Sequence, residues 1–374
     1  MSLPVAGTAL YIADPYVTAR SLSTPLLLAA LIAVLDKKWL RVAILVVITL
    51  LLHPLMALWG AFFLAATAIA QAHSRIRPLL GFVIAALVAL ALVRLFSPEE
   101  NLLAQTLAHS RSYWYLANWE WYEWIGMLAP PALLMALHFR SPWTSTQASL
   151  TRAAVAIFML SGAASLLLVH PTSTHLLLAR MQPLRMMHFA YLVFLFLLGA
   201  KVGSFVENVR SLRILPIVAG FVIAGCALFL MQRSLYASSN HIELPNSPLR
   251  NPWEQAFIWI REHTPVDAIV AMDAHYISTP GEDAQSFRAL AQRSCLPDYS
   301  KDGGVASVYR VLAPKWQRGE HAQQDLNQLN DVERLKQLHG TKASWILLPA
   351  ASQTAFACLY QNNAVKVCRL PVSY

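Results

Sequence analysis

Charged residues are scarce in this 374-residue sequence: they make up 13% of the chain, whereas hydrophobic residues make up 56%. A soluble globular chain of this size carries nearer 25% charge, so an ordinary soluble protein is excluded. Acidic residues are the scarcer sign, 20 against 29 Lys and Arg, which gives a formal net charge of +9. The surplus basic residues lie in short loops between apolar blocks, where they set membrane topology. The basic balance therefore predicts no nucleic-acid partner.

Motifs that hold cofactors or metals are also missing. The sequence has no glycine-rich phosphate loop, no GxGxxG after a strand, no HExxH and no CxxC pair. His170 and His175 lie five residues apart around a proline, which is a poor spacing for metal ligands. The sequence therefore predicts no metal site, and its C-terminal part carries no signature of an autonomous hydrolase.

Apolar runs recur from residue 22 to residue 231 and then stop. Several are shorter than the roughly 20 residues that a full crossing needs, so some are expected to be tilted, broken or re-entrant. The pattern predicts an α-helical polytopic membrane protein with about eight transmembrane helices. Its membrane domain would cover residues 1–235 and an extracytoplasmic α/β or α+β domain residues 236–374. The apolar runs are 22–35, 39–52, 54–71, 79–96, 125–139, 153–170, 185–200 and 214–231.

Basic residues are distributed unevenly between the loops. Ten Lys and Arg lie in DKKWLR, AHSRIRP, RSPWTSTQASLTR and KVGSFVENVRSLR, whereas the alternate segments hold five. The positive-inside rule then places the first set in the cytoplasm and residues 232–374 outside. We expect a multi-pass protein of a bacterial inner (cytoplasmic) membrane, with membrane lipids as partners and its C-terminal domain in the periplasm. Residues 1–25 resemble an internal loop rather than a signal peptide, so a short translocated N-terminus and missing upstream helices are both open alternatives.

The C-terminal region alternates between helical and strand patterns. Residues 251–265 begin with an Asn N-cap and a Pro at the first helical position, and AIVAMD (268–273) is typical of a buried strand. Further on, DVERLKQLHG, ASWILLP and FACLYQNNAVKVCRL predict a helix, a strand and a hairpin. Cys358 and Cys368 flank the hairpin turn symmetrically, which fits either a disulfide or two buried thiols. Asp273 and His275 are site candidates, although an exposed strand-to-loop junction is the commoner explanation.

Unusual polar residues of the membrane part gather on the side predicted to be outside. The run LLLARMQPLRMMHF (176–189) holds two arginines and a histidine, although a charge at membrane depth costs at least about 2.5–3.5 kcal/mol. Each polar residue on this side has an ordinary explanation when it is taken alone. It could belong to a surface ion pair, a loop hydrogen bond or an aromatic belt, or it could reach a lipid phosphate by snorkelling. Together they favour an outward-facing polar cavity. Its members are Asp14, Arg20, His53, His109, Arg111, Glu120, Glu123, Arg180, Arg185 and His188.

Three short motifs resemble the GT-C superfamily of membrane glycosyltransferases, in particular its uncharacterised bacterial branch. They are the corner LLHPLMAL, the arginine before a late membrane helix in QPLRMMHF, and the domain opening WEQAFIWIREHTPVDA. The resemblance implies an enzyme that takes a sugar from a polyprenyl-phosphate carrier and passes it to an acceptor at the outer membrane face. The one cofactor that it leaves open is a divalent cation.

The resemblance also implies roles for the polar residues. The family's catalytic carboxylate usually lies in the first external loop, but Asp14 is the only acidic residue before residue 36 and lies in a different context. Asp14, Glu120 and Glu123 are therefore alternatives for the general base. Arg180, Arg185 and Arg20 would bind the lipid phosphate, and His53, His109, Arg111 and His188 would line the cavity.

Two alternatives stand beside this interpretation. Arg185 could instead form a structural ion pair with an acidic residue such as Glu120 or Glu123. The chain could also be a non-catalytic protein of lipid or polysaccharide transport or assembly. A transporter commonly has two related halves, and no repeat relates the halves of this sequence.

Overall fold

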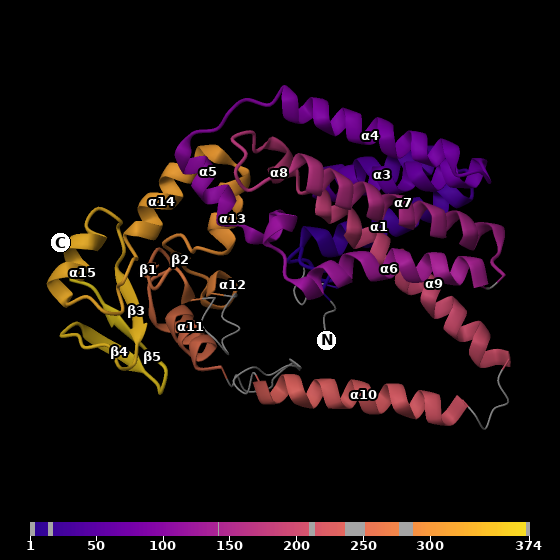
Figure 1. The fold of residues 1–374 in the computed structure, drawn as a ribbon. Helices are drawn as coiled ribbons and strands as arrows, with labels where there is room; N and C mark the ends of the chain where they lie inside the picture. The colour runs from indigo at the N-terminus through magenta and orange to yellow at the C-terminus, as the bar shows by residue number, and fades with distance from the viewer. Residues whose placement is uncertain are drawn as a thin grey trace. The chain divides into compact units, whose positions relative to one another are not determined.

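A computed structural model describes residues 4–13, 18–140, 142–208, 214–235, 251–276 and 287–371. The chain divides into two compact units, Met1–Leu215 and Pro216–Tyr374 (Figure 1). The sequence places the boundary at residue 235, one helix later, because α10 (Ile214–Leu235) is apolar. The structure groups α10 with the second unit, and its described large apolar side chains are mostly exposed. An apolar helix with this exposure is suited to a lipid environment.

The first unit is mainly helical, and every predicted apolar run before residue 201 overlaps a helix. Its helices are α1 (Ala19–Leu35), α2 (Trp39–Leu52), α3 (Pro54–Ala72), α4 (Arg77–Leu95), α5 (Leu102–His109), α6 (Trp121–Arg140), α7 (Ser145–Leu168), α8 (Leu177–Met181) and α9 (Met186–Asn208). Three short 3-10 turns join them: η1 (Ser112–Trp114), η2 (Leu116–Asn118) and η3 (Pro183–Arg185).

Four helical segments are long and apolar enough to cross a membrane: Pro54–Ala72, Arg77–Leu95, Ser145–Leu168 and Leu177–Ser204. Helices α1 and α2 are apolar but shorter. On α4, the large side chains of Leu80, Ile84, Val88 and Leu92 are exposed along one face, whereas Leu90 is buried. An exposed apolar stripe at helical spacing fits contact with lipid. The described chain thus has the helices of a membrane protein; eight crossings and their orientation stay predictions.

The loops of the first unit gather at two ends. At one end, Arg152 donates to the carbonyls of Ser74 and Ala70, 2.8 Å each, and Gln71 donates to the carbonyl of Leu35. We call this the basic end, because the lysine- and arginine-rich loops 35–38 and 72–77 lie there, beside the start of α7. The other end is the polar end, made of residues 96–120 and 169–188; Figure 1 shows α5 and α8 there. The side of the membrane on which each end lies stays a prediction.

The second unit contains a mixed five-stranded sheet in the order β2-β1-β3-β5-β4. Strands β2, β1 and β3 are parallel, and β5 and β4 form the antiparallel hairpin that the sequence predicts. The strands are β1 (Ile269–Ala271), β2 (Ser294–Cys295), β3 (Trp345–Pro349), β4 (Ala357–Gln361) and β5 (Val365–Arg369). The helices are α11 (Pro252–His263), α12 (Phe287–Ala291), α13 (Lys301–Val308), α14 (Ala313–His321) and α15 (Asp331–Leu338).

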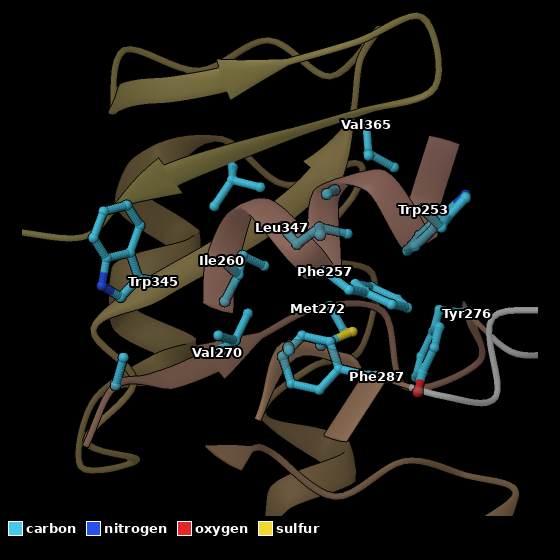
Figure 2. Packing of buried hydrophobic residues seen from close by; sticks show 14 residues of the cluster. Trp253, Phe257, Ile260, Val270, Met272, Tyr276, Phe287, Trp345, Leu347 and Val365 are labelled. Carbon is cyan, nitrogen blue, oxygen red and sulfur yellow. The ribbon is translucent and has the colours of Figure 1, made fainter. Parts of the chain in front are cut away.

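Helix α11 covers one face of this sheet through its apolar stripe. Trp253, Phe257 and Ile260 recur at helical spacing, and Figure 2 shows them over Val270 of β1 and Leu347 of β3. Asn251 accepts a hydrogen bond from the backbone nitrogen of Trp253 and so caps the helix, as the sequence predicts.

The hairpin turns at Asn362, whose side-chain oxygen accepts hydrogen bonds from the backbone nitrogens of Ala364 and Val365. Cys358 and Cys368 face each other across β4 and β5 and are joined as a disulfide. The structure therefore contains a disulfide between these cysteines and not two buried thiols.

Candidate functional site

Arg180 lies in α8, and Arg185 lies in η3, which joins α8 to α9. Gln182 adopts a left-handed conformation, with φ +52°, and turns the chain between α8 and η3. The indole nitrogen of Trp59 donates a hydrogen bond to the carbonyl of Met181 at 2.7 Å. The hydroxyl of Ser161 donates one to the carbonyl of Pro183 at 3.1 Å. Helices α3 and α7 thereby anchor this segment.

Arg180 forms a buried ion pair with Glu100. Its Nη1 lies 2.5 Å from a carboxylate oxygen of Glu100, and the two side chains are 10% and 5% exposed. Glu100 is held in turn: its backbone nitrogen donates to Thr174, and its carbonyl accepts from the Gln105 amide. An arginine at this depth needs a carboxylate close by, because an unpaired buried charge is strongly disfavoured. Arg180 is thus part of a structural ion pair with Glu100; the ion pair expected for Arg185 with Glu120 or Glu123 stays a prediction.

Aromatic side chains of the polar end contribute buried polar atoms. Burial raises the pKa of Tyr115 to about 12, and the positive charge of Arg180 partly opposes this rise. The ring of His109 lies edge-on to Tyr115, with 5.9 Å between ring centres. Within the described chain, no hydrogen-bond partner is found for Nε2 of His109, the hydroxyl of Tyr115, or the indole nitrogens of Trp114 and Trp119. Buried polar groups in folded proteins are nearly always paired, so this cluster is suited to a polar ligand.

Arg185 lies directly before α9 and is half-buried. Its Nε donates to the side-chain oxygen of Gln182 at 2.5 Å. His188 follows in the first turn of α9 and is buried. A helix N-terminus carries roughly half a positive charge, so Arg185 and the start of α9 both favour an anion at the same point.

The candidate carboxylates have different environments. Glu120 is exposed just before α6. A carboxylate oxygen of Glu123 accepts a hydrogen bond from the backbone nitrogen of Glu120 at 2.8 Å, as in a capped helix start. Gly7 lies against Glu123, since a Cβ atom at Gly7 would lie only 2.7 Å from the carboxyl carbon of Glu123. Asp14 lies outside the described residues.

The remaining predicted site residues are distributed around the same unit. His53 caps α3, because its Nδ1 accepts a hydrogen bond from the backbone nitrogen of Met56. Arg20 is half-buried in the first turn of α1, and Arg111 is 5% exposed between α5 and η1. His175 is a loop anchor, since its Nδ1 donates to the carbonyl of Ser97 at 2.7 Å. Among the described residues, no group of three His, Cys, Asp or Glu side chains could hold a metal ion.

The structure thus brings Arg180, His109 and Arg185 to one end and adds Glu100 and Gln182, which the sequence analysis did not single out. The signal for Glu100 was available: it closes an acidic pair, Glu99-Glu100, directly after an apolar helix. No family model, no curated protein and no solved structure matches this chain.

Proposed function

We propose that the polar end of the first unit binds the phosphate of a polyprenyl-phosphate-linked sugar, and that the chain is a GT-C-like glycosyltransferase. It would act at the outer face of a bacterial cytoplasmic membrane, where the positive-inside rule places the polar end and the C-terminal domain. The observation that carries this proposal is the position of Arg185, a half-buried cation at the N-terminus of α9.

Two features of that position support a phosphate ligand. The helix dipole disfavours a cation at a helix N-terminus. An anion bound there interacts favourably with both the cation and the helix end, and so offsets their mutual repulsion. The guanidinium group also offers a planar set of donors that stays charged at every physiological pH and fits phosphate oxygens in pairs. Arg180 pairs with Glu100 and supports the loop. Arg185 lies directly at the start of α9 and would be the principal phosphate ligand because of that position.

The buried donors of Trp114, Tyr115 and Trp119 support a polar ligand at the same end. Indole nitrogens are donors only, and a tyrosine hydroxyl can donate or accept. Sugar hydroxyls and phosphate oxygens accept such hydrogen bonds. Of the acidic residues at this end, the exposed Glu120 would be the accessible general base for an acceptor hydroxyl.

A binding experiment tests the phosphate site. The purified chain would be titrated with a fluorescent polyprenyl phosphate, alongside Arg185→Lys and Arg185→Ala. We expect Arg185→Lys to weaken binding about tenfold or more, because one lost charged contact is worth roughly 1.5–3 kcal/mol. Arg94→Ala is the matched control: Arg94 lies at the same end but in the last turn of α4, where the helix dipole disfavours anions. Unchanged binding in a folded Arg185→Ala protein refutes the phosphate site.

A non-catalytic role in lipid or polysaccharide transport or assembly is the second candidate. It is favoured by the state of two carboxylates at this end: Glu100 is paired with Arg180, and Glu123 caps the start of α6. A transfer assay with a radiolabelled polyprenyl-phosphate sugar separates the two functions. An enzyme should transfer label and lose transfer in Glu120→Gln while retaining lipid binding. A handling protein should bind the lipid without transfer in either form.

A further inference from the structure

A polar pocket of about 380 Å³ lies in the second unit, where β1 ends. Asp273 and His275, which the sequence analysis noted beside this strand end, line one side of it. The segment from Glu320 to Gln328, which leads from α14 to α15, lines the other. Pockets that bind small ligands have volumes of about 300–1,000 Å³, so this one suits a ligand of one or two rings.

The order of the strands makes this location informative. The chain passes from β1 to β2 on one side and then crosses to β3 on the other side, so the parallel strands run β2-β1-β3. In open sheets of this kind, ligands bind beyond the carboxyl ends of the strands, at the point where the strand order reverses. Asp273 and His275 follow the carboxyl end of β1, which is the strand at that point.

The base of the pocket is held together by one buried glutamine. Gln323 accepts a hydrogen bond from the backbone nitrogen of Met272 at 3.3 Å and donates to the carbonyls of Pro297 and Gly319 at 2.7 and 3.1 Å. It therefore ties together the end of β1, the loop after β2 and the last turns of α14. A binding site held this way is preorganised.

The lining is rich in groups that both donate and accept hydrogen bonds. A carboxylate oxygen of Asp273 accepts from the amide of Asn327 at 2.8 Å, while the other Asn327 amide atom, Oδ1, is buried and has no partner within the described chain. His275 stacks on Tyr299, with 4.3 Å between ring centres, and lies 3.7 Å from a carboxylate oxygen of Glu320. Gln324 and Gln328 add two more amides.

We infer that this pocket is a binding site for a neutral saccharide. Its three carboxylates repel phosphates and acidic sugars, and its lining has almost no apolar side chains for a hydrophobic ligand. The described residues offer no group that could hold a metal ion there. Sugar hydroxyls act as donors and acceptors at once, which matches carboxylates and amides placed side by side. The inference does not depend on the lipid-phosphate site of the first unit.

A saturation-transfer NMR experiment on the full chain tests this inference. The protein would be kept in a detergent without a sugar headgroup, because a maltoside or glucoside would compete. The probes are disaccharides of glucose, galactose, mannose and N-acetylglucosamine. We expect at least one to bind with a single site, and Asp273→Asn to weaken it about tenfold or more through the loss of one charged acceptor.

Asp267→Asn is the matched control, because Asp267 is exposed and precedes the same strand, at its opposite end. It should leave the affinity unchanged, and Gln328→Ala should lower it without touching the hydrogen bonds of Asp273. Arg185→Ala should also leave saccharide binding intact, which separates this result from failure of the proposed function. The inference is overturned if no disaccharide binds at millimolar concentration, if both pocket variants bind as the wild type does, or if only Mg²⁺ or a polyamine binds.

Discussion

Replacing Glu100 by glutamine should destabilise the first unit more than any exposed charge change does. The substitution keeps the shape of the side chain but removes the negative charge 2.5 Å from Arg180, which is only 10% exposed. Removing one member of a buried ion pair costs about 3–5 kcal/mol, because the other charge stays buried while its close opposite charge is lost. An exposed pair provides the contrast: Lys38 and Asp36 are 2.8 Å apart but about half exposed. Asp36→Asn should cost less than about 1 kcal/mol.

The double variant Glu100→Leu/Arg180→Met separates charge from packing. It removes both charges and keeps apolar volume, and such replacements are often neutral or stabilising in other proteins. We therefore expect it to be more stable than Glu100→Gln alone. Arg180→Met should resemble Glu100→Gln, since it leaves a buried carboxylate.

Unfolding in mixed micelles, followed by tryptophan fluorescence as the fraction of dodecyl sulfate rises, measures these differences. The first unit contains several tryptophans, including the buried Trp114 and Trp119 at the polar end. If Glu100→Gln loses no more stability than Asp36→Asn, the pair is solvated, and the assignment of Arg180 to a structural role is wrong.

Three further predictions concern the second unit. Cys358 and Cys368 should resist alkylation until a reductant is added; free labelling of both in the unreduced protein would contradict the bridge. Burial opposes ionisation of Asp331, but hydrogen bonds from the backbone of Ala355, from Thr354 and from Arg334 outweigh it and lower the pKa. Its stabilisation is therefore present above the unfolded pKa of about 3.9 and lost as the pH falls through the lower folded pKa. Asp331→Asn should flatten that acid-side loss in a pH series of melting temperatures; an unaltered profile refutes it. A reporter fused after the last residue should be active only outside the cytoplasm, and activity of a cytoplasmic reporter reverses the orientation.

The sequence predicted correctly those helices and turns whose signals, such as apolar runs, helix caps and turn residues, lie within one short segment. The apolar runs became helices, and Asn251 with Pro252 marked the start of α11 correctly. The hairpin formed at Asn362, because an Asn side chain can bond to the backbone of its own turn. Strand β2, with two residues, and the short helices α12 to α14 were not predicted. Their burial depends on neighbours that lie far away in the sequence, and their own apolar periodicity is too short to detect.

The candidate site was predicted only as a set of residue types. The sequence predicted Arg180 as a ligand of lipid phosphate, whereas in the structure it pairs with Glu100, which lies 80 residues earlier. The pocket beside Asp273 depends in the same way on Gln323 and on the strand order, which no local pattern encodes. Side-chain pairs across long loops are set by packing of whole helices and strands, so a single sequence leaves several partners open.

The two arginines of one short segment illustrate how the surroundings of a side chain determine the role expected of it. Arg180 and Arg185 are five residues apart in the sequence, yet a buried carboxylate compensates the first, whereas the second shares its position with the positive end of α9. The buried pair with Glu100 explains the position of Arg180 by stability, whereas the position of Arg185 beside the positive end of α9 is the basis of the proposed anion site. Substitutions at the two positions should therefore separate: Arg180→Met should lower stability, and Arg185→Ala should lower lipid-phosphate binding while stability stays near that of the wild type. If the two substitutions produce the same loss in both measurements, the segment acts as one structural unit and the ligand must be sought elsewhere.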